Sequence, residues 1–310
     1  MERLESGVNR DSPSVIGLGE LLWDVFPDSR RPGGAPANVA YQAQQLGGRG
    51  LVASRVGNDE LGREILEYLK DRGLDVSTVQ TDPDHPTGCV TVDVSDAHHP
   101  TYTIHEDVAW EYLQSDDALL TAMGHAAAVC FGTLAQRSPV SRDAIRTALA
   151  AASCDCLIVC DVNLRQHYWS ADCVTESLEA ASVAKLNHEE ARLLAPVLDC
   201  PADDLTEFSA ELRRRYSLRA VCVTRAERGC LLVGSDEVAD VPGRRVDVVD
   251  AVGSGDAFTA GLITALLENW PLRAAAEFAN EIGALVATQR GAMPDLADRF
   301  RELRARYAPQ

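Results

Sequence analysis

Residues 250–261 read Asp250-Ala251-Val252-Gly253-Ser254-Gly255-Asp256-Ala257-Phe258-Thr259-Ala260-Gly261. Residues 245–249 before them are strand-like, and residues 257–268 after them predict a long helix. The small residues between the two elements permit a tight turn whose backbone N–H groups point one way, and a helix N-terminus adds partial positive charge. The stretch therefore predicts a strand–turn–helix unit with an anion hole at Gly253, Ser254 and Gly255.

Asp256 lies in the first turn of this predicted helix, beside the anion hole. The helix dipole favours an ionised carboxylate there, so Asp256 can accept a proton from an alcohol while the amides stabilise charge on a transferring phosphoryl group. An ordinary capped helix after a glycine turn explains the same letters, because aspartate favours helix N-termini in its own right. By itself, the stretch leaves both interpretations open.

Short apolar segments alternate with helix-length segments along the rest of the chain. The expected strands lie at residues 14–20, 51–56, 126–130, 156–161, 183–186 and 221–224. This pattern is typical of an α/β protein with a mostly parallel central sheet covered by helices on both faces. No repeat or linker divides the sequence, so we expect a single domain over residues 1–310.

One stretch departs from the alternation. Residues 88–94 and 101–104 read as two alternating strands joined by a polar turn, with no helix between them. An antiparallel ribbon inserted near the strand ends is a candidate lid over a binding site. A simple edge hairpin is the alternative.

Charge and composition limit the partners. The 310 residues are 46% hydrophobic, enough for a large core, and 29 basic against 47 acidic residues give a net charge of −18. Such a chain lacks the positive field that nucleic-acid binding needs, so we expect small-molecule partners. Lys70 and Lys185 are the only lysines, and no Gly-Lys-Ser/Thr occurs, which excludes a Walker-type P-loop.

The cysteines and the apolar segments indicate the compartment. Nine cysteines are scattered along the chain without the paired spacing of a zinc site, so we expect buried free thiols in a reducing environment. The first fifteen residues carry no apolar signal region, and no apolar stretch approaches the roughly 20 residues of a membrane span. We expect a soluble, cytoplasmic protein with no membrane partner.

Two separated motifs resemble the signatures of the PfkB, or ribokinase-like, family of carbohydrate kinases. Residues 250–261 resemble its DTxGAGDxFxxG signature, departing only at Ala251 and Ser254, both small for small. Residues 33–40, GGAPANVA, resemble its GGxxxN motif in the form typical of fructokinase-like members. The resemblance implies a three-layer α/β/α ribokinase-like fold, with a small β lid formed by about residues 22–32 and 86–106.

The resemblance also implies a sugar site and a catalytic base. It assigns the base to Asp256, the anion-hole amides to residues 253–255, and sugar binding to Asp24, Gly33, Gly34 and Asn38. Paired glycines allow a sugar and a lid to approach the backbone, and asparagine both donates and accepts toward hydroxyls. Residues 161–165 resemble the DxNxR stretch of fructokinases and ketodeoxygluconate kinases. Arg165 can pair there with a carboxylate, a phosphate or a sugar oxygen, and a structural ion pair with Asp161 is the alternative.

Further matches concern the nucleotide and ions. Residues 187–190 resemble the family's NxxE motif, which implies nucleotide contact by Asn187 and water-mediated Mg²⁺ support by Glu190, although a helix cap gives the same letters. Residues 224–229 resemble its TxGxxG loop, with Ala226 in place of the first glycine. The residues that the resemblance places at ATP are Asn187, Thr224, Gly229, Gly255 and Asn280. Those that it places at a monovalent cation such as K⁺ are Asp250, Val252, Val286, Gln289, Gly291 and Asp295.

Taken together, the motifs predict an ATP-dependent sugar kinase that transfers the γ-phosphoryl group to a primary hydroxyl of a monosaccharide, with fructose as the leading substrate. The alternatives are 2-keto-3-deoxygluconate kinase or ribokinase-type activity. A catalytically inactive sugar-binding regulator is the alternative from another class. Some relatives dimerise through the lid, and the alternating apolar residues Val90, Val92 and Val94 suit either packing within the lid or a homodimer through it.

Overall fold

The computed structural model describes residues 12–93, 101–201 and 203–309. Within these ranges the main sheet contains nine strands in the order β13-β12-β11-β10-β9-β8-β1-β4-β5. Their bounds are β1 Ser14–Leu18, β4 Arg49–Gly57, β5 Val79–Asp82, β8 Ala128–Phe131, β9 Leu157–Asp161, β10 Val183–Asn187, β11 Ala220–Thr224, β12 Cys230–Val233 and β13 Val238–Val241. All neighbours from β5 to β11 pair in parallel, and β12 and β13 extend one edge antiparallel. The predicted α/β class with a mostly parallel sheet is confirmed.

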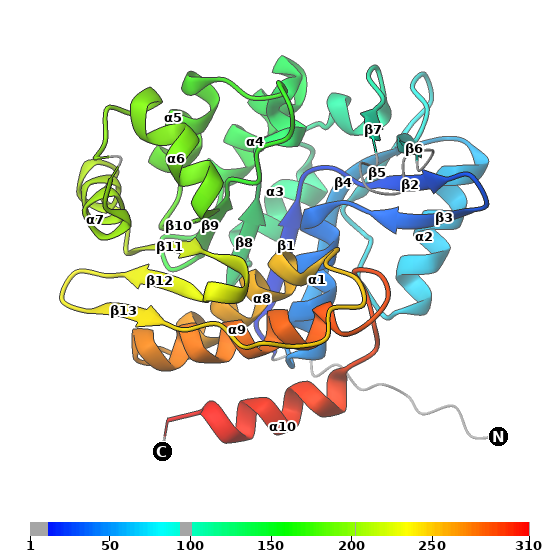
Figure 1. Ribbon diagram of the computed structural model, residues 1–310. Helices are drawn as coiled ribbons and strands as arrows, with labels where there is room; N and C mark the ends of the chain where they lie inside the picture. The colour runs from blue at the N-terminus through cyan, green and yellow to red at the C-terminus, as the bar shows by residue number, and fades with distance from the viewer. Residues whose placement is uncertain (1–11, 94–100, 202, 310) are drawn as a thin grey trace.

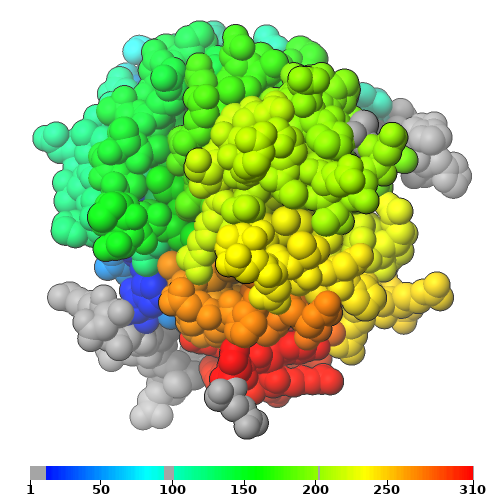
Figure 2. Space-filling model, turned by 90° about the vertical axis from the view of Figure 1, so that its left-hand side faces the viewer, coloured from blue at the N-terminus to red at the C-terminus, as the bar shows by residue number. Residues whose placement is uncertain are grey.

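Helices cover both faces of this sheet (Figure 1). Their bounds are α1 Ala35–Gln45, α2 Glu60–Asp71, α3 Asp117–Gly124, α4 Pro139–Ala150, α5 Ala171–Ala180, α6 His188–Val197, α7 Leu205–Arg215, α8 Ser254–Leu267, α9 Leu272–Ala287 and α10 Ala297–Tyr307. Short 3₁₀ turns occur at Ala109–Tyr112, Leu134–Arg137 and Ala226–Arg228. Figure 2 shows α9 and α10, in orange and red, stacked at the base of the molecule.

Within the described ranges the core contains three clusters of buried apolar residues, and the two largest lie on opposite faces of the sheet. Strand β1 supplies both, because successive side chains of a strand point to opposite faces. Val15 packs in the cluster with α1, α8 and α9, whereas Ile16 and Leu18 pack in the cluster with α3 to α7. No helix in the described ranges has the length and apolar character needed to cross a membrane.

A second, four-stranded sheet lies beside the main one and has the order β3-β2-β6-β7. Its strands are β2 Leu22–Phe26, β3 Ser29–Gly33, β6 Gly88–Asp93 and β7 Thr101–Ile104. The antiparallel β6–β7 pairing confirms the ribbon expected from the sequence, whereas its turn and residue 94 lie outside the described residues. This four-stranded sheet carries the segments predicted to form a lid.

The prediction of a strand at residues 245–249 is wrong. Those residues form an irregular segment between β13 and α8, and Val248 and Val249 are 62% and 57% exposed. Val249 N–H does donate to the carbonyl of Ala287 on α9 at 2.9 Å, but β-branched residues favour a strand only where a neighbouring strand offers them a packing surface. No such neighbour is present along this segment in the described part of the chain.

Candidate active site

The conformation of the turn before α8 requires glycine at residue 253. Gly253 adopts a left-handed conformation with φ +77°, and a Cβ atom there would lie 2.5 Å from the Cβ atom of Ala292. The helix then begins at Ser254, whose hydroxyl donates to the carbonyl of Ala251 at 2.8 Å. Because the first N–H groups of a helix have no partner within it, this turn offers donors and partial positive charge to an anion. The N–H group of Ser254 already donates to the carbonyl of Ala251 at 3.2 Å, and the anion hole at residues 253–255 stays a prediction.

Asp256, in the first turn of α8, contacts a residue 218 positions away. Asn38 on α1 donates from Nδ2 to Asp256 Oδ2 at 2.8 Å, while the buried Oδ1 of Asn38 has no partner. Asn38 reaches this place because α1 begins directly after Gly34, whose φ is +117° and where a Cβ atom would lie 2.4 Å from the carbonyl oxygen of Glu20. Both predicted signatures therefore meet at one hydrogen bond.

Burial raises the pKa of Asp256 to about 6. The negative charge of Asp161 contributes to this increase, whereas the hydrogen bond from Asn38 and the charges of Lys185 and Arg165 lower the pKa. A carboxylate with this pKa is mainly ionised at neutral pH and is more basic than an exposed aspartate. Its protonation state suits a general base for an alcohol.

Below α8, Asp161 at the end of β9 pairs with Lys185 on β10. Lys185 Nζ lies 3.0 and 2.9 Å from the two carboxylate oxygens of Asp161. Asp161 is thus occupied by Lys185, and Arg165 forms no ion pair among the described residues. The alternative in which Arg165 makes a structural ion pair with Asp161 is wrong, because the buried lysine takes that place.

Three carboxylates lie near enough to Arg165 for its charge to lower their pKa values. Asp24 lies on β2, and a Cβ atom at Gly33 would lie 2.7 Å from its Oδ2. Burial raises the pKa of Asp24 to about 6, against the opposing charges of Arg165 and Arg31. Arg165 lowers the pKa of Glu20 and Asp256 as well, so its exposed guanidinium acts on all three acids. Asp24, Gly33, Asn38 and Arg165, predicted for the sugar, therefore lie around one region together with Asp256.

The sequence reasoning missed Glu20 in this region. Glu20 follows β1 and is only 4% exposed, and its Oε2 has no hydrogen-bond partner. Burial raises its pKa to about 7, and the charge of Asp256 adds to the increase. An acidic residue directly after a buried strand was a usable signal, because ligands of α/β sheets bind at the carboxyl ends of the strands.

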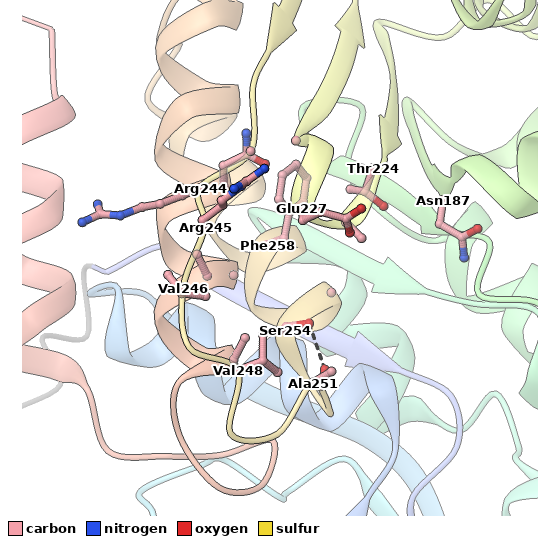
Figure 3. Close-up of a pocket in the computed structure, with 18 of the residues that line it drawn as sticks. Asn187, Thr224, Glu227, Arg244, Arg245, Val246, Val248, Ala251, Ser254 and Phe258 are labelled. Atoms are coloured by element: carbon pink, nitrogen blue, oxygen red, sulfur yellow. Dashed lines mark hydrogen bonds between the residues drawn. The ribbon is translucent and has the colours of Figure 1, made fainter. Parts of the chain in front are cut away.

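The predicted nucleotide residues line one cavity of about 1060 Å³ (Figure 3). Asn187 and Thr224 lie on one side of it, and Arg244 and Arg245 of the irregular segment lie on the other. The predicted residues found in its wall are Asn187, Thr224, Gly229, Gly255 and Asn280. Asn280 has a buried Nδ2 without a partner, a free donor in the wall of the cavity.

Ala226, which replaces a glycine of the resembling loop, also lines this cavity. Its φ of +52° lies in the left-handed region that favours glycine. Gly229, three residues later, has φ +89°, and a Cβ atom there would lie 2.0 Å from the carbonyl oxygen of Val241. The loop thus keeps the glycine-type conformation at residue 226 in spite of the alanine.

Glu190 forms a helix cap with Asn187. Asn187 Oδ1 accepts from the N–H groups of Glu189 and Glu190 at 2.9 Å, and Glu190 Oε2 accepts from Asn187 N–H at 2.8 Å. The other carboxylate oxygen of Glu190 accepts from Leu164 N–H at 2.8 Å. Both oxygens are therefore held by the backbone, which leaves water-mediated contact as the way in which Glu190 could serve a metal.

Some of the residues predicted at a monovalent cation are brought together around Asp250. Its carboxylate accepts from the N–H groups of Val252 and Gly291, each at 3.0 Å. The carbonyl of Val286 accepts from Gln289 N–H at 2.9 Å at the end of α9, and Asp295 is exposed beyond it. Within the described ranges no group of three or more His, Cys, Asp or Glu side chains is placed to hold a metal ion.

The sequence and the fold are similar to those of known proteins. The profile described as pfkB family carbohydrate kinase matches residues 10–299. A fructokinase of Escherichia coli is 30% identical over 303 residues, which cover 92% of this chain and 96% of that protein. The crystal structure of a Vibrio cholerae fructokinase with fructose, ADP and a calcium ion has a TM-score of 0.79 and 27% identity, and covers 94% of this chain and 99% of that one. An aminoimidazole riboside kinase of Salmonella enterica, with its riboside and an ATP analogue, has a TM-score of 0.77, 26% identity and the same coverage.

Proposed function

Because the chain belongs to the pfkB family of carbohydrate kinases, we propose that it transfers the γ-phosphoryl group of ATP to a primary hydroxyl of fructose. The hydrogen bond between Asn38 and Asp256 carries this proposal, since it joins the two signature motifs at one carboxylate. The nucleotide cavity lies on one side of the α8 turn, and the acids around Arg165 lie near Asp256. This arrangement suits transfer from a nucleotide to a polyol.

In the proposed reaction Asp256 accepts the proton of the sugar hydroxyl. The hydroxyl oxygen forms a bond to the γ-phosphorus as the bond from that phosphorus to ADP breaks. The N–H groups at the start of α8 stabilise the charge on the transferring group. Asn38 orients the carboxylate of Asp256 by its hydrogen bond. Asp24 and Glu20 are placed to accept hydrogen bonds from sugar hydroxyls.

The nucleotide is proposed to occupy the 1060 Å³ cavity, with Thr224 and Gly229 along its loop side and the Asn280 amide as a free donor. A divalent cation such as Mg²⁺ would neutralise the phosphates when the nucleotide is bound, and Glu190 would contact it through water. The Vibrio cholerae relative holds calcium with ADP, which supports metal use here. A monovalent cation such as K⁺ would lie near Asp250 and Gly291.

Arg165 favours a sugar acid as the alternative substrate. This arginine has no ion-pair partner in the described part of the chain, and its guanidinium can bind a carboxylate bidentately. A sugar acid such as 2-keto-3-deoxygluconate would satisfy it. A sugar acid is disfavoured, however, because its carboxylate would be repelled by the three acids that already lie near Arg165. A neutral sugar avoids this repulsion. We therefore place fructose first.

A coupled ADP-release assay over fructose, 2-keto-3-deoxygluconate, ribose, tagatose and adenosine tests the proposal. We expect fructose to have the highest kcat/KM, and Arg165→Met to lower that value less than tenfold. If 2-keto-3-deoxygluconate is preferred and Arg165→Met lowers its kcat/KM by about 10²-fold, the sugar acid is the substrate. Arg299→Met, on the exposed face of α10, is the control. Sugar binding by calorimetry without ATP turnover would instead indicate a sugar-binding regulator.

A further inference from the structure

Lys185 is a buried cation directly beneath the anion hole. It is one of two lysines in the chain and is only 7% exposed, and its side chain extends from strand β10 to the first turn of α8. Its Nζ lies 3.4 Å from the place where a Cβ atom of Gly255 would be. An ammonium group is therefore held next to the backbone whose N–H groups face the phosphoryl position.

A hydrogen bond joins the Lys185–Asp161 ion pair to the buried face of α8. Thr259, fully buried one turn after Gly255, donates from Oγ1 to Asp161 Oδ2 at 2.8 Å and lies 2.9 Å from the carbonyl of Gly255. The contacts join the ends of β9 and β10 to the first turn of the helix. Any displacement of Asp161 or Lys185 would therefore be transmitted to the anion hole.

A purely structural role does not account for a buried ion pair at this place. Taking two charges out of water is costly, and well-packed apolar residues of similar size are often as stabilising as a buried ion pair. Asp161 is 4% exposed, and its chain neighbours Cys160 and Val162 belong to one of the buried apolar clusters. The placement beside Gly255 and Asp256 points instead to the reaction.

We propose that Lys185 and Asp161 are paired positioning residues for phosphoryl transfer: Lys185 supplies fixed positive charge under the anion hole, and Asp161 strengthens Asp256 as the base. The inference rests on the proposed kinase function. It does not alter the bonds made and broken, because the proton still goes to Asp256 and the phosphoryl group to the sugar oxygen. It assigns to the protein interior the cationic role that a P-loop lysine plays elsewhere.

Asp161 and Lys185 have opposite effects on the pKa of Asp256. Asp161 raises the pKa of Asp256 and Lys185 lowers it, with Asp161 the stronger of the two. The groups that face this pair or Asp256 from the surrounding elements are Asn38 on α1, Glu20 after β1, Arg165 after β9, Glu190 on α6, and the buried thiols of Cys130 on β8, Cys160 on β9 and Cys222 on β11. Neither substitution replaces any of these groups.

The test measures kcat, KM and the pH profile of kcat/KM for Lys185→Met and Asp161→Asn. We expect Lys185→Met to lower kcat by about 10²-fold, with KM for fructose changed less than threefold, because fixed charge acts most on the charge that develops during transfer. The acid limb of the profile should move to higher pH in Lys185→Met and to lower pH in Asp161→Asn. Lys70→Met, on the exposed side of α2, is the matched control and should leave all values unchanged.

The double variant Asp161→Asn/Lys185→Met provides a second measurement, because it leaves no unpaired buried charge if a single variant fails to fold. We expect it to melt as a folded protein in calorimetry, with kcat about 10²-fold down and an acid limb shifted less than in Asp161→Asn alone. Near-normal kcat in the double variant, or shifts of the same sign in the two single variants, overturns the inference. Absence of turnover with every sugar in the wild-type protein overturns the proposed function instead.

Discussion

Arg31, on β3 of the four-stranded sheet, lies with its Nη1 3.1 Å from Oδ2 of Asp250, which precedes the α8 turn. The same Asp250 carboxylate holds the N–H groups of Val252 and Gly291. One carboxylate thus connects the four-stranded sheet, the turn before α8 and the segment after α9. Movement of the sheet relative to the anion hole must stretch or break this contact.

Removal of this connection tests its role. Arg31→Ala should change the free energy of unfolding by less than about 1 kcal/mol, because the pair is partly exposed. It should nevertheless increase amide hydrogen exchange in residues 242–252, because this segment loses its ion pair with the four-stranded sheet. Arg30→Ala is the matched control, since Arg30 is similarly exposed but pairs with Glu64 on α2. Equal exchange in both variants would show that the contact does not order the segment.

The base assignment predicts a pH profile. With a pKa of about 6 for Asp256, kcat/KM should fall about tenfold per pH unit below pH 6, because the protonated acid cannot accept the sugar proton. Asp256→Asn should lower kcat by roughly 10²-fold to 10⁴-fold. Steady-state assays from pH 5 to 8, with circular dichroism to confirm folding, measure both effects. Near-normal turnover of a folded Asp256→Asn protein contradicts the assignment.

The hydrogen bond from Asn38 should move that profile. It lowers the pKa of Asp256, so Asn38→Ala should shift the acid limb to higher pH and also reduce kcat through loss of orientation. Asn58→Ala, at an exposed position after β4, is the control and should leave the limb in place. The same assays over pH 5 to 8 detect the shift. An unchanged limb in Asn38→Ala would mean that the contact does not act on the base.

Glu20 predicts a pH-dependent stability. Its pKa is raised to about 7 in the folded protein from an ordinary value of 4.5, so the folded state binds more protons than the unfolded state between those values. Stability should therefore fall as pH rises from about 4.5 to 7. Glu20→Gln should remove this cost, which by linkage reaches up to about 3 kcal/mol above pH 7. Thermal melts at pH 5 and pH 8 should show a gain only at pH 8.

Glu67→Gln on the exposed face of α2 serves as the control for Glu20, because it removes an acid of the same type without relieving burial. It should give small and equal changes at both pH values. A gain for Glu20→Gln that is as large at pH 5 as at pH 8 would point to packing rather than to ionisation.

The left-handed alanine at residue 226 predicts a stabilising substitution. Ala226→Gly should raise the free energy of unfolding by up to about 1 kcal/mol, because the relief of strain at φ +52° exceeds the entropy cost of glycine. Ala151→Gly, at an exposed helix end with φ −84°, should be neutral or destabilising. Chemical denaturation compares the two. A loss of stability in Ala226→Gly would show that the backbone strain is negligible.

Local patterns account for most of what could be predicted. The alternation of buried strands and helices, and the glycine turns at residues 34 and 253, are properties of short segments, and the structure contains them. The irregular course of residues 245–249 depends instead on the absence of a neighbouring strand, which no local pattern records. Glu20 and Lys185 were missed for a related reason: their burial beside Asp256 is created by elements far apart in the sequence.

The contact between Gly253 and Ala292 has a consequence for synthesis on the ribosome. Gln42 on α1 also donates to the carbonyl of Ala292, at 2.7 Å, so α1 and the turn before α8 both contact the segment that follows α9. Asn38 is synthesised first, Asp256 follows 218 residues later, and Ala292 follows Asp256. A growing chain therefore has no complete site until the segment around Ala292 has been synthesised, however far the residues before it have folded.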